Sequence, residues 1–159
     1  MNVFISYTRE KENYDNVVSH FRDRLENELR MRDRQSTVFQ DADMISAGAC
    51  FSETIETALA QADALIVLVS PAWLNSDWCR REHETFSRNK QAAGHAPRIL
   101  PLLWVDTNLN GLVEDPIATS LSKVQYRDWR NLRKKDWQSE AVKDEADEIA
   151  QALYKLVSE

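Results

Sequence analysis

Glycine is scarce in this chain, which has 159 residues but only three glycines, Gly48, Gly94 and Gly111. The G-x-G-x-x-G loop of dinucleotide-binding folds and the G-x-x-x-x-G-K-[ST] phosphate loop both need closely spaced glycines, which let the backbone approach a phosphate. Three widely separated glycines can form neither loop. The sequence therefore excludes both glycine-loop ways of holding a nucleotide.

Cysteine and histidine are also rare. Cys50 and Cys79 are the only cysteines, so the chain has neither a disulfide framework nor a C-x-x-C zinc motif. His20, His83 and His95 are scattered along the sequence without metal-ligand spacing. We therefore expect no metal or other cofactor, and a reducing, cytoplasmic location.

An excess of positive charge and long apolar runs are absent too. The net charge is −6, which disfavours direct binding to nucleic acid. The longest apolar runs, Ala64–Val69 and Ile99–Val105, are far shorter than the roughly 20 residues that span a bilayer, and no charged leader precedes the first strand. We expect neither a membrane segment nor a signal peptide. The segment Arg130–Lys135 is basic and the last helix is acidic, and a solvated surface is the ordinary explanation for both.

Predicted strands alternate with predicted helices along the chain. Apolar and β-branched runs predict strands at Val3–Tyr7, Ser36–Phe39, Ala64–Val69, Arg98–Val105 and Val124–Tyr126. Helical spacing of apolar residues predicts helices over 17–29, 51–62, 76–89 and 142–156, the third of them capped near Ser76 and Asp77. A loop with Asn108, Asn110, Gly111 and Pro116 precedes the last strand.

This alternation predicts an α/β fold with a doubly wound, five-stranded parallel sheet of flavodoxin-like order 2-1-3-4-5 and helices on both faces. Residues 1–159 form a single domain in this interpretation, and we expect it to be the N-terminal effector part of a longer protein. Ligands of such sheets bind beyond the carboxyl ends of strands 1 and 3. That rule directs attention to Ser6–Glu10, the loop after Phe39, and Ser70–Glu82.

The third helix carries a carboxylate in an unusual place. Trp78, Glu82 and Phe86 follow one another at intervals of four, so all three share the helix face that meets the sheet. A buried carboxylate loses hydration, which raises its pKa unless a partner compensates. One interpretation is an ion pair between Glu82 and a neighbouring arginine, with Arg9, Arg80 and Arg81 as candidates. The other is a site carboxylate placed at the crevice by its helix.

Other reactive side chains offer weaker signals. His83 lies about 100° round the helix from Glu82, and we expect it to face solvent. Cys79 has no histidine partner at a telling position, and packing against the sheet accounts for it. Ser6 and Ser70 are not part of a G-x-S-x-G nucleophile elbow.

Four segments resemble the motifs of TIR (Toll/interleukin-1 receptor) domains in their order and spacing. Val3–Tyr7 resembles the opening strand of that family, and Phe39–Asp41 with Gly48 and Phe51 resembles its second strand and BB loop. Val67–Pro71 resembles the third strand with its Ser-Pro ending, and Trp78–Glu82 resembles the W-C-x-x-E segment that opens the third helix.

The resemblance implies an activity. Many bacterial, plant and axonal TIR domains cleave NAD⁺ between nicotinamide and ribose, as hydrolases or ADP-ribosyl cyclases, and a bacterial antiphage defence that depletes NAD⁺ is the setting we expect here. By resemblance Glu82 is the catalytic carboxylate. The expected substrate-binding residues, by resemblance or by position at the strand ends, are Tyr7, Arg9, Asp41, Phe51, Ser70 and Trp78.

The expected chemistry is consistent with these residue types. Nicotinamide leaves as a neutral molecule, so the difficulty lies in the positive charge that develops on the ribose. A fixed carboxylate at Glu82 would stabilise that charge. Arg9 would contact the pyrophosphate, and Phe51 or Trp78 would stack on the nicotinamide or wall the site.

The loop after the second strand has two interpretations. Asp43, Met44, Ile45 and Gly48 lie in it, and its apolar residues are either simple anchors on the core or contacts for a neighbour. In the resembling family this loop docks on another TIR domain, so activity would require a homo-oligomer or filament. A fused or associated sensor domain would then control assembly. The alternative function is a non-enzymatic TIR module that only binds partner proteins.

Overall fold

The computed structural model describes residues 1–8, 16–40 and 53–159. The sheet is parallel throughout and has the order β2-β1-β3-β4-β5, which confirms the predicted topology. Its strands are β1 (Asn2–Ser6), β2 (Thr37–Gln40), β3 (Ala64–Val69), β4 (Ile99–Leu103) and β5 (Arg127–Asp128).

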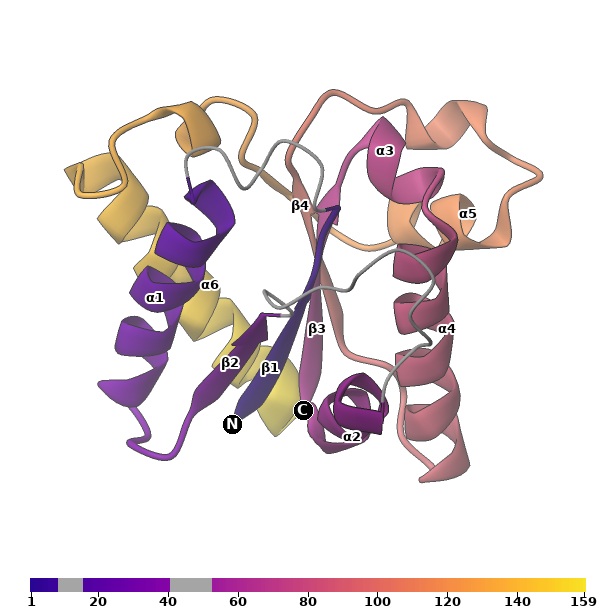
Figure 1. Cartoon of the computed structure of the whole chain (residues 1–159), viewed down its shortest axis with the longest axis horizontal. Helices are drawn as coiled ribbons and strands as arrows, with labels where there is room; N and C mark the ends of the chain where they lie inside the picture. The colour runs from indigo at the N-terminus through magenta and orange to yellow at the C-terminus, as the bar shows by residue number, and fades with distance from the viewer. Residues whose placement is uncertain (9–15, 41–52) are drawn as a thin grey trace.

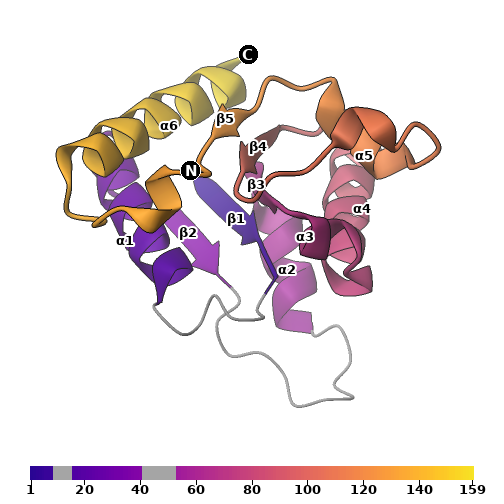
Figure 2. The ribbon, with the colours of Figure 1, turned by 90° about the horizontal axis from the view of Figure 1, so that it is seen from above.

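Helices cover both faces of the sheet (Figures 1 and 2). On one face lie α1 (Val17–Arg30) and α6 (Glu140–Ser158). On the other lie α2 (Glu53–Gln61), α3 (Pro71–Leu74), α4 (Asp77–Ala92) and α5 (Pro116–Ser122). Two short 3-10 helices, η1 (Leu109–Gly111) and η2 (Leu132–Lys134), lie in the connections around the last two strands.

The alternation of side chains along β1 supplies two separate cores. Val3 and Ile5 pack with α1 and α6, whereas Phe4 packs on the opposite face beneath α2 and α4. Every residue of the central strand β3 is buried, as expected for a strand covered by helices on both sides. Ser6 therefore points to the same face as Phe4, which is the face that α4 covers.

Two parts of the prediction near the last strand are wrong. The fifth strand is Arg127–Asp128 and not Val124–Tyr126, because Val124 and Tyr126 are exposed and the buried aromatic of this segment is Trp129. The preceding segment contains α5 as well as a loop. Its N-cap Asp115 and first-turn Pro116 are ordinary helix-start signals that the loop interpretation overlooked.

Candidate functional site

The candidate site lies at the carboxyl ends of β1 and β3, where the winding of the sheet reverses. Two helix starts flank it. Ser70 caps α3, accepting a hydrogen bond from the backbone N–H of Trp73 at 3.0 Å. Ser76 caps α4, accepting from the N–H of Cys79 at 3.2 Å, as the sequence predicts.

Glu82 is buried on α4, with 1% of its surface exposed. Its Oε1 accepts a hydrogen bond from Ser6 Oγ at 2.8 Å. The same hydroxyl oxygen accepts a hydrogen bond from Trp73 Nε1 at 3.0 Å. Three elements thus meet at the Ser6 hydroxyl, which fixes the carboxylate of α4 against the end of β1.

Ser6 and Trp73 are the functional neighbours of Glu82 that the sequence interpretation did not assign to the site. Both lie in segments at the strand ends to which the ligand rule directs attention, and the strand alternation places Ser6 opposite Tyr7. Trp73 depends on α3, a four-residue helix that no periodicity can indicate. Ser70, a predicted binding residue, acts in the structure as the cap that begins this helix.

The side chain of Tyr7 lies on the other face of the sheet. It packs in the core with Val3 and Ile5, and its hydroxyl accepts a hydrogen bond from Gln40 Nε2 at 3.2 Å. The backbone carbonyl of Tyr7 accepts a hydrogen bond from Cys79 Sγ at 3.4 Å. The main chain of Tyr7 therefore joins α4 to the end of β1, while its side chain contributes to the opposite core.

The helix face that carries Glu82 is apolar above and below the carboxylate, as predicted. Phe86 is fully buried and Trp78 is half-buried against the same core. Of the three arginines considered as ion-pair partners of Glu82, Arg80 pairs with another carboxylate. It donates two hydrogen bonds to Asp115, at 2.9 and 2.7 Å. This pair ties α4 to the start of α5 and holds the pKa of Asp115 at about 2, with hydrogen bonding by Arg80 as the main cause.

His83 is buried, which corrects the prediction that it faces solvent. Its ring lies edge-on to Trp73, with centroids 6.2 Å apart. The physical reason is α3, which covers the part of α4 that a bare helix would leave in water. Both ring nitrogens are buried without a hydrogen-bond partner among the described residues, and burial lowers the pKa of His83 below 6.5.

Several predicted residues lie outside the described part of the chain. They are Arg9, Asp41 and Phe51 of the expected substrate cleft, and Asp43, Met44, Ile45 and Gly48 of the expected assembly loop. In the ranges that the structure describes, no group of three or more His, Cys, Asp or Glu side chains is arranged to hold a metal ion. None of the described helices is long and apolar enough to cross a membrane.

Comparison with known proteins gives one family. The sequence profile of the TIR domain matches residues 3–145. None of the curated proteins compared with the chain matches it.

Two solved structures share the fold. The TIR domain of the Toll-related receptor TRR-2 from Hydra magnipapillata superposes with a TM-score of 0.54 at 18% identity, covering 99% of this chain and 98% of that one. The heterodimer of the RPS4 and RRS1 TIR domains contains a chain that superposes with a TM-score of 0.57 at 17% identity, with 99% of each chain covered. With the profile match over most of its length, the chain belongs to the TIR domain family.

Proposed function

We propose that this TIR domain cleaves NAD⁺ at the bond between nicotinamide and ribose, with Glu82 as the catalytic carboxylate. The observation that carries the proposal is a glutamate only 1% exposed at the switch point of the sheet, which accepts a hydrogen bond from a serine that a tryptophan holds in turn. Burying a carboxylate costs free energy, so an oriented buried carboxylate at the ligand edge of a sheet suggests a chemical role.

The proposed reaction has a simple balance. The bond between the ribose C1′ and the nicotinamide nitrogen breaks, and both electrons leave with nicotinamide, which departs as a neutral molecule. Water adds to C1′ and releases one proton, giving ADP-ribose. If a group of the substrate itself attacks C1′ in place of water, the product is a cyclic ADP-ribose.

Glu82 would act on the positive charge that develops at C1′. Its carboxylate would stabilise that charge directly or accept hydrogen bonds from the ribose hydroxyls. Ser6 would act through Glu82 by holding one carboxylate oxygen in place, and Trp73 would act by holding the hydroxyl of Ser6. By resemblance to the family, Arg9 and an aromatic wall complete the proposed site, and the reaction needs no metal. NAD⁺ is the substrate and not a cofactor.

A second candidate function is a non-enzymatic module that binds other TIR domains. The observation that favours it is the likeness to a chain of the RPS4–RRS1 heterodimer, in which two TIR domains associate. The two functions are compatible, since association of TIR domains would complete the NAD⁺ site in the first proposal. A cytoplasmic bacterial defence, with a sensor domain that triggers assembly, is the setting we propose for the enzyme.

Nicotinamide release tests the proposal. Concentrated protein is incubated with NAD⁺ and the products are separated by HPLC, beside the variants Glu82→Gln and Glu84→Gln. We expect Glu82→Gln to lower the rate about 100- to 1,000-fold, because it removes a preorganised charge. Glu84→Gln makes the same change of charge on the exposed side of α4 and should leave the rate unchanged.

Two results would contradict the proposal in different ways. Equal release by the parent and by Glu82→Gln would remove Glu82 from the catalytic role. Absence of nicotinamide release by the parent protein, even when the domains are clustered on a scaffold, would favour the binding module. Mass analysis of the HPLC fractions separates linear from cyclic ADP-ribose.

A further inference from the structure

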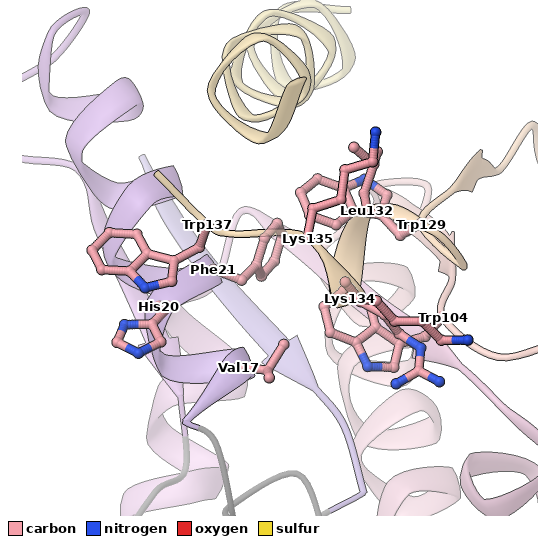
Figure 3. A pocket seen from close by; sticks show the side chains of 10 residues that line it. Val17, His20, Phe21, Trp104, Trp129, Leu132, Lys134, Lys135 and Trp137 are labelled. Atoms are coloured by element: carbon pink, nitrogen blue, oxygen red, sulfur yellow. The ribbon is translucent and has the colours of Figure 1, made fainter. Parts of the chain in front are cut away.

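A cavity opens at the same carboxyl edge, on the face of the sheet that α1 and α6 cover, opposite the face that holds Glu82. Figure 3 shows the side chains that line it. Its volume is about 480 Å³. It lies between the first turns of α1 and the segment that runs from β5 through η2 toward α6. The residues that line it are Val17, His20, Phe21, Trp104, Trp129, Leu132, Arg133, Lys134, Lys135 and Trp137.

Half of the residues that line the cavity have aromatic rings. Trp104 follows β4 and Trp129 follows β5, and their indoles stack with centroids 5.9 Å apart and planes 14° from parallel. His20 stacks on Trp137 across the mouth, at 4.4 Å and 8°. Trp104 and Trp129 are only 3% and 2% exposed, so a ligand reaches a small part of each indole. Aromatic rings also meet favourably edge to face, and a planar ring can make that contact here.

Three consecutive cations lie on the rim of this aromatic wall. None of Arg133, Lys134 and Lys135 forms an ion pair with a carboxylate in the described ranges, although Arg127 is paired with Glu145 and Glu148, and Arg130 with Asp106 and Asp128. In a chain of net charge −6, cations without carboxylate partners beside a cavity create a local positive field. The cavity is therefore suited to an anion.

A buried donor also lacks a protein partner here. Trp129 is 2% exposed, and its indole Nε1 has no hydrogen-bond acceptor among residues 1–8, 16–40 and 53–159. Arg133 Nε is buried and unpartnered in the same part of the chain. Buried N–H groups are nearly always satisfied by protein or by ordered water, so these two are available to an acceptor that occupies the cavity.

We propose that this cavity is a second small-molecule site, which takes a planar aromatic ring carrying a phosphate, as in a nucleoside monophosphate. The ring would contact the exposed parts of the aromatic side chains, and the phosphate would take hydrogen bonds from the basic run and offset part of its charge. Cavities of this size ordinarily hold one small ligand. The site lies across the sheet from Glu82, so its occupancy does not depend on NAD⁺ cleavage.

The five tryptophans of the chain report on the two sites separately. Trp73 and Trp78 lie near Glu82, whereas Trp104, Trp129 and Trp137 line the aromatic and basic cavity. The test is a titration of ¹⁵N-labelled protein with adenosine 5′-monophosphate, following the five indole N–H signals, each assigned by a single Trp→Phe variant. We expect the signals of Trp104, Trp129 and Trp137 to shift in a saturable way. Binding in this cavity should leave the signals of Trp73 and Trp78 unchanged.

Adenosine and inorganic phosphate separate the two halves of the ligand, and each alone should bind about tenfold more weakly or worse. The double variant Lys134→Glu/Lys135→Glu should weaken adenosine monophosphate binding about tenfold or more. Lys123→Glu/Lys143→Glu makes the same charge change at exposed positions that do not line the cavity and should bind like the parent. Glu82→Gln should also bind like the parent, whether or not it cleaves NAD⁺.

Three outcomes would overturn the proposal. One is the absence of indole shifts at millimolar ligand. Another is movement of Trp73 and Trp78 alone, which places the ligand in the Glu82 cleft. The third is equal affinity in the parent and in the Lys134→Glu/Lys135→Glu variant.

Discussion

The hydroxyl of Ser6 makes two hydrogen bonds, one donated to Glu82 and one accepted from Trp73. Each of the three groups is buried, so neither partner can take water in exchange if the hydroxyl is removed. The orientation of the proposed catalytic carboxylate therefore depends on a residue that has no direct part in the reaction. Ser6 is a positioning residue, and its removal should affect both stability and rate.

Ser6→Ala should lower the unfolding free energy by about 1–3 kcal/mol, because two buried polar groups each lose one hydrogen bond. It should also slow nicotinamide release about tenfold by loosening the carboxylate. Urea unfolding and HPLC measure the two effects. Ser139→Ala is the matched control, since Ser139 caps α6 and its loss should cost about 1 kcal/mol without changing the rate per folded molecule. An unchanged rate in Ser6→Ala would show that Glu82 needs no such support.

His83 should make stability depend on pH near neutrality. Burial is the main cause of its lowered pKa, Arg80 adds to it, and Glu84 opposes it. Because the folded-state pKa lies below the ordinary value of 6.5, the unfolded chain binds more protons at mildly acidic pH. The folded protein therefore keeps its full stability above pH 6.5. Its free energy of unfolding decreases as the pH falls from 6.5 toward the folded-state pKa of His83.

The measurement is the unfolding free energy of the parent and of His83→Gln at pH 7.5 and 5.5. We expect the parent to lose more stability than His83→Gln over this range. His95→Gln, which removes an exposed histidine, should follow the parent. Identical losses in all three proteins would mean that His83 gains its proton without unfolding.

At the scale of elements, α3 and α5 matter more than their length suggests. The short helix α3 supplies Trp73 and covers His83. The start of α5 is held by Asp115, whose Oδ1 accepts from the N–H groups of Ile117 and Ala118 while both of its oxygens accept from Arg80. These contacts connect α3 and α5 to α4, the helix that carries Glu82.

Asp115→Ala should destabilise the protein by about 1–2 kcal/mol, because it removes both the helix cap and the ion pair with Arg80. Asp115→Asn keeps a capping oxygen and should cost about half as much. The folded-state pKa of Asp115 is about 2, below its ordinary 3.8, so this stabilisation is complete above about pH 4 and is lost as the pH falls toward 2.

Acid titration of thermal unfolding compares the parent with Asp115→Asn. The asparagine variant should lose less stability than the parent between pH 4 and 2. Parallel curves would show that the carboxylate of Asp115 titrates alike in the folded and unfolded chain.

Sequence patterns predict the long elements well and the short ones poorly. The apolar run of β3 and the helical spacing of α1, α4 and α6 are visible because each contains several buried residues. The two-residue β5 is fixed by its pairing with Leu102 and Leu103 of β4, which leaves no periodic signal. For α5 a signal existed in Asp115 and Pro116.

At the scale of the whole molecule, the carboxyl edge of the sheet carries one proposed site on each of its two faces. The face covered by α2 to α5 holds Glu82, which lies on α4, and the face covered by α1 and α6 holds the aromatic and basic cavity. Figure 2 shows the two groups of helices, and Figure 3 shows the side chains that line the cavity. Trp104 and Trp129 are held at this edge by backbone hydrogen bonds from their N–H groups to Val69 and Leu103. The sheet thus separates the two proposed sites by its own thickness.

Association of domains is the remaining whole-molecule prediction, and it rests on the family. Gly48→Arg should lower nicotinamide release at high protein concentration by preventing docking of the loop that contains it, while thermal stability stays that of the parent. Size-exclusion chromatography at the same concentration should show a smaller species. Unchanged activity together with unchanged size would mean that this loop has no part in assembly.

The sequence by itself determined the α/β alternation, the sheet order and the helix face on which Glu82 lies. The sheet order follows from how strands and helices alternate along the chain, and the helix face follows from spacing within one segment. Only the tertiary structure decided that Ser6 and Trp73 hold Glu82, that His83 is buried, and that the basic run lies against an aromatic cavity. The contact between Ser6 and Glu82 joins positions 76 residues apart. Partners at such distances are chosen by how strands and helices pack, and local patterns contain no record of that choice.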